Sequence, residues 1–420
     1  MKPLLSLAWA SAWHRRFVLS ITLVAVALSA FLLASIEQIR ADVKEGFSQS
    51  VSGTDLIVGP RTGSTQLLLY SVFRIGQATN NMKWESVQAL AAHRAVRWVV
   101  PISLGDSHRG YPVVATTTAY FNHYHYGEQQ ALVLAQGRRF DQLYDAVIGS
   151  EVARVLGYRI GTRLVLSHGD GALEGNDHTD KPFTVVGILA PTGTPVDRSV
   201  HISLEAMQAL HVDWMGGVRM PGFHVEDKDL TPDVLRPREV TAVLVGLKSR
   251  AAVFAVQRWL SEYADEPLMA VLPGVALDEL WQVVGVAEKA LVAITSLVAV
   301  TSFAGLIATM LAGLNERRRE LAILRAVGAS PRSVLGLLLF EGASLSVLGV
   351  GLGWLVSWLA LFACRDLAQA RWGIHLSAGW PSESQCMLML GVALAGLMSS
   401  LLPAWRAYRL SLADGLSPKT

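Results

Sequence analysis

Long apolar stretches divide the chain into four segments that can cross a membrane and one large polar segment between the first two. Apolar residues dominate positions 17–39, 284–314, 334–363 and 387–405. A helix of about 20 residues crosses the roughly 30 Å hydrocarbon core of a bilayer, so each stretch is long enough. We therefore expect an α-helical membrane protein with four transmembrane helices. A mixed α/β extracytoplasmic domain, residues 40–283, is inserted between helices 1 and 2.

Basic residues set the expected orientation. They lie before the first stretch, after the second and after the fourth, at Arg15, Arg16, Arg317, Arg318, Arg319, Arg325, Arg332, Arg406 and Arg409. Cytoplasmic loops carry an excess of Lys and Arg. Residues 1–16 (a cytoplasmic or interfacial helix), 315–333 and the tail 406–420 should therefore be cytoplasmic, and the loop 364–386 outside. A cleaved signal peptide is the alternative for the first stretch, but the run is long, which favours an uncleaved anchor.

The extracytoplasmic segment combines strand and helix patterns. Alternating or β-branched runs predict strands at 113–118, 164–166, 183–189 and 240–247, and helical spacing predicts helices at 84–93, 204–210 and 250–263. Residues 216–237 are rich in Gly, Pro and Asp and predict a connection. We expect a lobe built from both ends of the segment and a smaller lobe inserted in the middle.

Composition and motifs exclude several function classes. The chain of 420 residues is 51% hydrophobic and 17% charged, with a mean hydropathy of +0.36 and a net charge of +2, which does not suit nucleic-acid binding. The sequence contains no GxxxxGK[ST], HExxH or GxSxG motif. We therefore expect a non-catalytic chain. An ATP-independent carrier would need ionisable residues inside the spans, and the second to fourth spans have almost none.

The segment between the second and third spans, residues 315–342, reads NERRRELAILRAVGASPRSVLGLLLFEG. We call its part up to residue 333 the elbow. Apolar residues recur at helical spacing up to Val327, Gly328 suits a left-handed helix stop, and Ser330 with Pro331 suits an N-cap and first turn. The pattern predicts a helix, a tight turn and the start of a second helix.

These segments carry a resemblance to a known family. The chain resembles the MacB/FtsX/LolC/LolE group of ABC-transporter permeases, which have four transmembrane helices and a large periplasmic domain. The similar segments are the elbow LAILRAVGAS at 321–330, VIGSEVARVLGYRIGTRLVL at 147–166, FTVVGIL at 183–189 and PAWRAYRLSLADGL at 403–416. The resemblance implies a subunit of the bacterial inner membrane with a MacB-like periplasmic core domain at 40–283.

The resemblance also implies a mechanism and partners. A dimer of a separate cytoplasmic ATPase, with its ATP and Mg²⁺, would drive two copies of the permease, and the membrane lipid and a periplasmic adaptor or carrier are further expected partners. The permease itself would bind no cofactor directly. The expected ATPase contacts are Glu320, Arg325, Gly328, Ala329, Ser330, Pro331 and Arg332. The cargo would be a lipoprotein, lipid, peptide, drug or zinc-linked molecule. The alternative is an FtsX-type signalling subunit that regulates a periplasmic partner without moving cargo, and a heterodimer is the alternative assembly.

Histidines and cysteines are the remaining candidates for chemistry. His123 and His125 alternate and would share one side of a strand, and His168 and His178 flank an acidic, Gly-rich loop. Imidazole suits zinc, so these four are candidate metal ligands, with ordinary surface histidines as the alternative. Cys364 and Cys386 lie near the outer ends of the third and fourth spans, where a disulfide and two buried small side chains are both consistent with the sequence.

Overall fold

The structure is a computed structural model that describes residues 16–50, 52–169, 177–215, 218–219, 225, 227–316, 322–323, 325–372, 376–377 and 379–409. The chain divides into two compact units. One, which we call the helical unit, comprises Met1–Asp42, Gly285–Leu367 and Leu376–Thr420. The other, the α/β unit, comprises Val43–Val284 and Ala368–His375.

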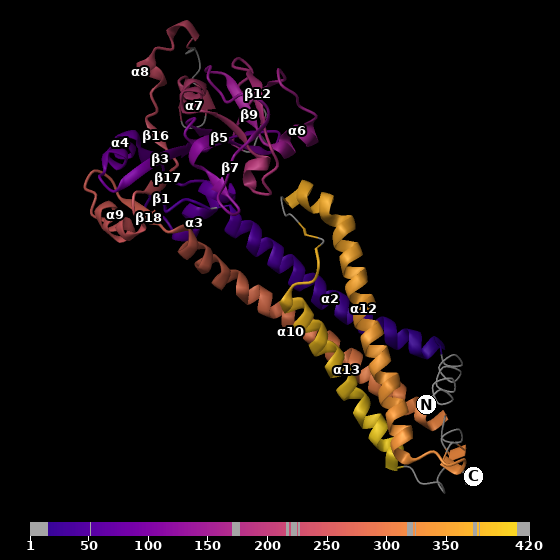
Figure 1. Ribbon diagram of the computed structural model, residues 1–420. Coiled ribbons are helices and arrows are strands. Elements are labelled where there is room, and N and C mark those ends of the chain that lie inside the picture. Colours follow the sequence, from indigo (N-terminus) through magenta and orange to yellow (C-terminus); the bar gives the residue numbers. More distant parts are fainter. Residues whose placement is uncertain are drawn as a thin grey trace. The chain divides into compact units, whose positions relative to one another are not determined.

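The helical unit is built from four long helices, α2 (Arg16–Gln49), α10 (Pro273–Glu316), α12 (Pro331–Trp372) and α13 (Glu383–Arg409), labelled in Figure 1. Each contains a window long and apolar enough to cross a membrane, which confirms the expected four spans. The helices extend past those spans. Helix α2 continues to residue 49, for example, because residues 40–49 include no proline and only one glycine.

Small residues bring the helices of this unit close together. A Cβ atom added to Gly353 of α12 would lie 2.3 Å from the carbonyl oxygen of Ala27 in α2, so only glycine fits there. Gly349, one turn earlier, approaches the same helix. The hydroxyls of Ser29 and Ser302 are 2.7 Å apart and join α2 to α10. Close backbone approach and small polar contacts are the usual means of packing helices in lipid, where burial of apolar surface between helices gives little drive.

A buried polar network links α2 to the chain before α13. The carboxylate of Asp42 accepts hydrogen bonds from Gln38 Nε2 at 2.9 Å and from the backbone N–H of Ser377 at 2.9 Å and its hydroxyl at 2.6 Å. Gln385 of α13 donates to Gln38 Oε1 at 2.6 Å. Asp42 and Gln385 are buried. Every group in this network has a partner, so its burial carries no uncompensated polar cost.

The two cysteines form neither a disulfide nor a pair of buried side chains, the two alternatives that the sequence left open. Cys364 in α12 and Cys386 in α13 are free thiols and both are exposed.

The α/β unit is organised around one large mixed sheet. Along the sheet the strands follow the order β10 (Arg163–Leu164), β12 (Phe183–Leu189), β9 (Asp145–Ile148), β13 (Val200–Ser203), β5 (Tyr111–Thr116), β3 (Val96–Ser103), β17 (Ala242–Leu247), β1 (Leu56–Pro60) and β18 (Leu268–Val271). Strands from the two ends of the segment form one half, and strands of the intervening segment form the other. The antiparallel pairing of β3 with β5 joins the halves.

Shorter strands branch from this sheet or pair beside it. Strand β8 (Leu134–Gly137) pairs with β12, and β4 (Asp106–His108) pairs with β5 and with β11 (Ser167–His168). Three two-stranded pairs complete the strands: β2 (Met82–Lys83) with β16 (Glu239–Val240), β6 (His125–Tyr126) with β7 (Gln130–Ala131), and β14 (Trp214–Met215) with β15 (Val218–Arg219).

Both faces of the sheet are covered, which explains why its central strands read as continuous apolar runs. Alternate residues enter two cores: Val113 and Ala115 of β5 face one, and Val114 between them faces the other. The first core packs on α4 (Trp84–Ala92), α6 (Ser150–Leu156), α7 (Leu204–His211) and α9 (Val253–Ser261). The second packs on α3 (Ser64–Leu68), the π-helical turn Leu69–Phe73 and α5 (Tyr120–His123). Helix α8 (Pro232–Leu235) buries no residue.

Most of the helices and strands predicted for this unit are confirmed. Strands β5, β12 and β17 and helices α4, α7 and α9 occupy the predicted segments within a few residues. The predicted strand at 164–166 is the least accurate, because β10 ends at Leu164. Leu166 is nevertheless fully buried. The backbone carbonyl of Leu166 accepts a hydrogen bond from the N–H of His178, so this residue pairs with the segment at His178 and not with β12.

Segments of α2 and α10 that belong to the α/β unit are anchored in its second core. Phe47, near the end of α2, stacks on Phe73 with ring centroids 4.2 Å apart, and its ring lies 5.8 Å from that of Trp281 in α10. Ala276 and Leu277 of α10 are buried in the same core. Both long helices therefore begin or end within the packed interior of the α/β unit.

Candidate metal centre

Three separate segments of the α/β unit bring four potential metal ligands together. Strands β4 and β11 are antiparallel with His168 directly opposite Asp106. The chain then returns beside β11, where the backbone N–H of His178 donates to the carbonyl of Leu166 at 2.8 Å. His211 is the last residue of α7. Main-chain hydrogen bonds thus hold three of the four positions, and a helix end supplies the fourth.

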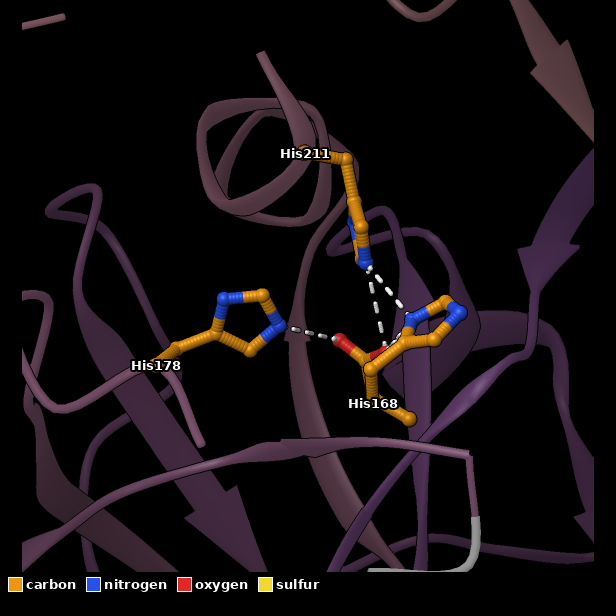
Figure 2. A group of neighbouring side chains, drawn as sticks. His168, His178 and His211 are labelled. Carbon is orange, nitrogen blue, oxygen red and sulfur yellow. Dashed lines mark hydrogen bonds and ion pairs between the residues drawn. The ribbon is translucent and has the colours of Figure 1, made fainter. Parts of the chain in front are cut away.

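The functional atoms of this group, which we call the His3Asp cluster, all lie within 4.8 Å of one another. His168 Nδ1 is 3.1 Å from Asp106 Oδ1 and 3.1 Å from His211 Nε2. His211 Nε2 is 3.3 Å from Asp106 Oδ1, and His178 Nε2 is 3.9 Å from Asp106 Oδ2. Figure 2 shows the three imidazole rings pointing inward toward the carboxylate.

Burial differs across the cluster. The side chains of Asp106 and His178 are 0% and 1% exposed, whereas those of His168 and His211 are 31% and 25% exposed. The ring of Trp214 lies 4.5 Å from that of His178 and 5.6 Å from that of His168. The cluster therefore has an enclosed floor and a partly open edge.

The environment shifts the pKa of each buried member of the cluster. Burial by itself would raise the pKa of Asp106, but hydrogen bonds from His168 and His211 and the charges of His211 and His178 outweigh it and lower that pKa to about 2. Burial lowers the pKa of His178 to about 4, so this ring is neutral at pH 7. Burial also opposes protonation of His211, but contact with the Asp106 carboxylate outweighs it and raises the pKa. The carboxylate is ionised and the His178 lone pair is free of a proton near neutrality.

Of the four predicted ligands, the structure brings His168 and His178 together and leaves His123 and His125 elsewhere. His123 ends helix α5 and His125 begins β6, so the expectation that one strand carries both was wrong. His123 stacks on Trp98 at 4.9 Å, and His125 Nδ1 donates to the His123 carbonyl at 2.8 Å. Both line a different cavity, of about 450 Å³, which also includes Asp55. In the described part of the chain, neither belongs to a group of three or more potential ligands.

Sequence reasoning missed Asp106 and His211. Asp106 lies 62 positions before His168 and His211 lies 33 positions after His178, and nothing local marks them as ligands. Asp177, in the acidic loop beside His178, instead accepts a hydrogen bond from the Ser167 hydroxyl. Most of that loop, residues 170–176, lies outside the described residues.

The elbow has the predicted local structure where it is described. The backbone N–H of Val327 donates to Ile323, and Gly328 ends that turn with φ of +106°, a value that favours glycine. The hydroxyl of Ser330 accepts from the N–H of Ser333 at 3.2 Å and caps α12, whose first residue is Pro331. The helix stop, N-cap and first-turn proline are thereby confirmed.

The predicted ATPase contacts differ in their surroundings. Ser330 and Arg332 are exposed, and Arg325, Ala329 and Pro331 are half-buried. Glu320 lies outside the described residues. Two further side chains not singled out from the sequence are prominent here: Ile323 is 51% and Val327 85% exposed. They are four residues apart and so share one side of the helical turn.

Comparison with known proteins assigns the family. Residues 18–263 match the MacB-like periplasmic core domain, and residues 292–412 match the FtsX-like permease C-terminal domain. The chain belongs to the FtsX-like permease family with a MacB-like periplasmic core domain. It is thus an ABC-transporter permease, a multi-pass protein of the inner membrane with its α/β unit in the periplasm. Membership implies a cytoplasmic ATPase partner.

Two relatives and one solved structure illustrate what the chain is similar to. The lipoprotein-releasing system transmembrane protein LolC of Xylella fastidiosa strain 9a5c is 24% identical over 69% of this chain and 70% of its own length. The macrolide export ATP-binding/permease protein MacB of Syntrophobacter fumaroxidans is 27% identical over 43% of this chain and 26% of its own. The crystal structure of the MacB periplasmic region from Actinobacillus actinomycetemcomitans aligns with 57% of this chain and 96% of that one, at 11% identity and a TM-score of 0.35.

Proposed function

We propose that this permease relays ATP-driven movement from a separate cytoplasmic ATPase to its periplasmic domain, and so drives export or extraction of a substrate. The proposed assembly contains two copies of the permease and two ATPase subunits, with both chain termini in the cytoplasm. The proposed substrate is a lipoprotein, lipid, peptide, drug or zinc-linked molecule, and the names of two relatives refer to lipoprotein release and macrolide export.

The observation that carries this proposal is the exposed apolar surface of the elbow. The elbow falls between the apolar helices that end at Leu314 and begin at Pro331, where no hydrocarbon would cover it. Ile323 and Val327 nevertheless present large apolar side chains to solvent. Such a surface, flanked by Arg325 and Arg332, suits insertion into a groove of another protein.

The anchoring of the long helices supports the outward half of the relay. Helix α2 has 34 residues and is therefore about 51 Å long, compared with roughly 30 Å for the hydrocarbon core. Helix α10 has 44 residues. Each continues without a break into the core of the periplasmic domain, where Phe47 and Trp281 pack. Phe47 and Trp281 are the proposed points at which movement of these helices reaches the core of the domain.

The elbow can be tested by changing its charge. The permease is co-expressed with its ATPase subunit, and the complex is purified and assayed for ATP hydrolysis. We expect Val327→Asp, Arg325→Glu and Ala329→Asp each to abolish co-purification or stimulation of the ATPase. Val133→Asp, at a valine that is 60% exposed in the periplasmic domain, is the matched control and should leave both unchanged. Normal coupling in all three elbow variants would refute the proposal.

A further inference from the structure

We propose that Asp106, His168, His178 and His211 bind a divalent transition metal of the zinc class in the periplasmic domain. This inference stands on the His3Asp cluster alone and does not depend on how the permease is coupled to its ATPase. The proposed site takes the place of the expected site at His123 and His125, and its ligands come together only in the folded chain.

The donor set selects the class of ion. Three imidazole nitrogens and one carboxylate oxygen suit Zn²⁺ and neighbouring first-row ions such as Co²⁺, Ni²⁺ and Cu²⁺. Ca²⁺ and Mg²⁺ need about six oxygen ligands, and the cluster offers at most two, both from Asp106. The chemistry of the side chains therefore favours a zinc-class ion over the hard cations.

The spacing of the donor atoms fits one ion. Two ligands bound at about 2.05 Å and separated by the tetrahedral angle lie about 3.4 Å apart. The measured separations of 3.1, 3.1, 3.3 and 3.9 Å lie on either side of this value. The remaining pairs of donor atoms are at most 4.8 Å apart, so rotations of the side chains about their torsions would bring all four atoms to coordination distance.

Two buried atoms of the cluster have no hydrogen-bond partner among the described residues, and they face each other. Asp106 Oδ2 and His178 Nε2 are both enclosed and unpaired, at a separation of 3.9 Å that is too long for a hydrogen bond. Buried polar atoms in folded proteins almost always have a partner, because an unpaired one costs about 1–3 kcal/mol. An ion between these two atoms would coordinate both.

The surrounding contacts prepare the ligands. His211 Nδ1 donates to the backbone carbonyl of Met207 at 2.9 Å, which directs its Nε2 lone pair at the cluster. Among the described residues, only imidazoles lie within ion-pair distance of Asp106. The nearby ammonium of Lys181 donates instead to the carbonyl of Ala209 at 2.6 Å. In the described part of the chain, no ammonium or guanidinium group therefore competes with a metal for the carboxylate.

An ion can reach the site from outside. A cavity of about 260 Å³ is bordered by Asp106, His168, His211 and Trp214. Asp106 and the two partly exposed histidines line this cavity, whereas the ring of His178 is buried behind them. This arrangement suits an ion that enters from the periplasm.

The test uses the full-length permease in detergent, stripped with a chelator and titrated with Zn²⁺ alone by calorimetry and by competition with a chromogenic chelator. Because Cys364 and Cys386 are exposed thiols that could bind zinc, all variants carry serine at both positions. We expect one Zn²⁺ per chain with micromolar or tighter affinity, and no comparable response to Ca²⁺ or Mg²⁺. Co²⁺ should give the intense visible absorption of a tetrahedral site.

Three variants decide the result. His168→Ala, at a partly exposed ligand, should weaken zinc binding by more than roughly a hundredfold while leaving the thermal transition of the metal-free protein in place. His178→Ala should have the same effect on zinc and serves as a second ligand test. The double variant His123→Ala/His125→Ala is the matched control and should bind as the parent does. Absence of stoichiometric binding, binding unaffected by His168→Ala, or binding lost only in the control would each overturn the proposal.

Discussion

Burial of His201 makes the stability of the periplasmic domain depend on pH. This histidine in β13 is completely buried beside the rings of Tyr120 and Phe121. Its Nδ1 lies 3.3 Å from the carbonyl of Val147, and its Nε2 has no partner. Burial, reinforced by the positive charge of Arg74, lowers the pKa of His201 to about 3. The ring stays neutral in the folded domain and takes up a proton near pH 6.5 when unfolded.

The sign and size of the effect follow from this difference in pKa. Because the unfolded chain binds more protons than the folded one between pH 6.5 and about 3, stability is complete above pH 6.5 and falls as the pH is lowered through this window. Going from pH 7.5 to pH 5 should cost about 2 kcal/mol, equivalent to a factor of about 30 in the unfolding equilibrium.

Hydrogen exchange of the full-length protein can measure this change. Between pH 7.5 and pH 5, the protection factors of the slowly exchanging amides in β9 and β13 should fall about 30-fold further in the parent protein than in His201→Phe. The comparison cancels the contribution of other titrating groups. Ile202→Val is the control, since it should weaken the same strand by roughly 1 kcal/mol without altering the pH dependence. An equal loss of protection in the parent and in His201→Phe would refute the reasoning.

Two further predictions concern the helical unit. Replacing Gly353 by Leu places side-chain atoms against the carbonyl of Ala27 and should lower the melting temperature in detergent by several degrees. Gly351→Leu is the control and should leave the melting temperature unchanged, because nothing lies within 4 Å of its Cβ position. Equal melting temperatures of the two variants would contradict the packing. Asp42→Ala removes the acceptor of three hydrogen bonds and should increase exchange at the Ser377 amide by at least tenfold, so unchanged exchange there would show that the network contributes nothing.

Local sequence pattern was sufficient for the elements that repeat a short period. Each of these elements depends on residues that are close together in the sequence. They are the four apolar stretches, the strands around Val113 and Leu244, and the turn at Gly328 followed by Pro331. Hydrophobic periodicity, caps and φ preferences act over the same short range, so they can be read directly. The family resemblance added the order of these elements and the ATPase partner.

Tertiary structure alone decided which histidines meet. His123 and His125 line one cavity, but among the described residues neither joins a group of three or more potential ligands. Asp106 and His211 are 105 positions apart and come together because β4 pairs with β11 in one particular register and α7 ends beside them. A shift of one residue in that register would turn His168 to the opposite face of the strand. Sequence therefore determined the four membrane-spanning stretches and most elements, whereas the candidate metal site depends on strand pairing, a long-range interaction that no local pattern encodes.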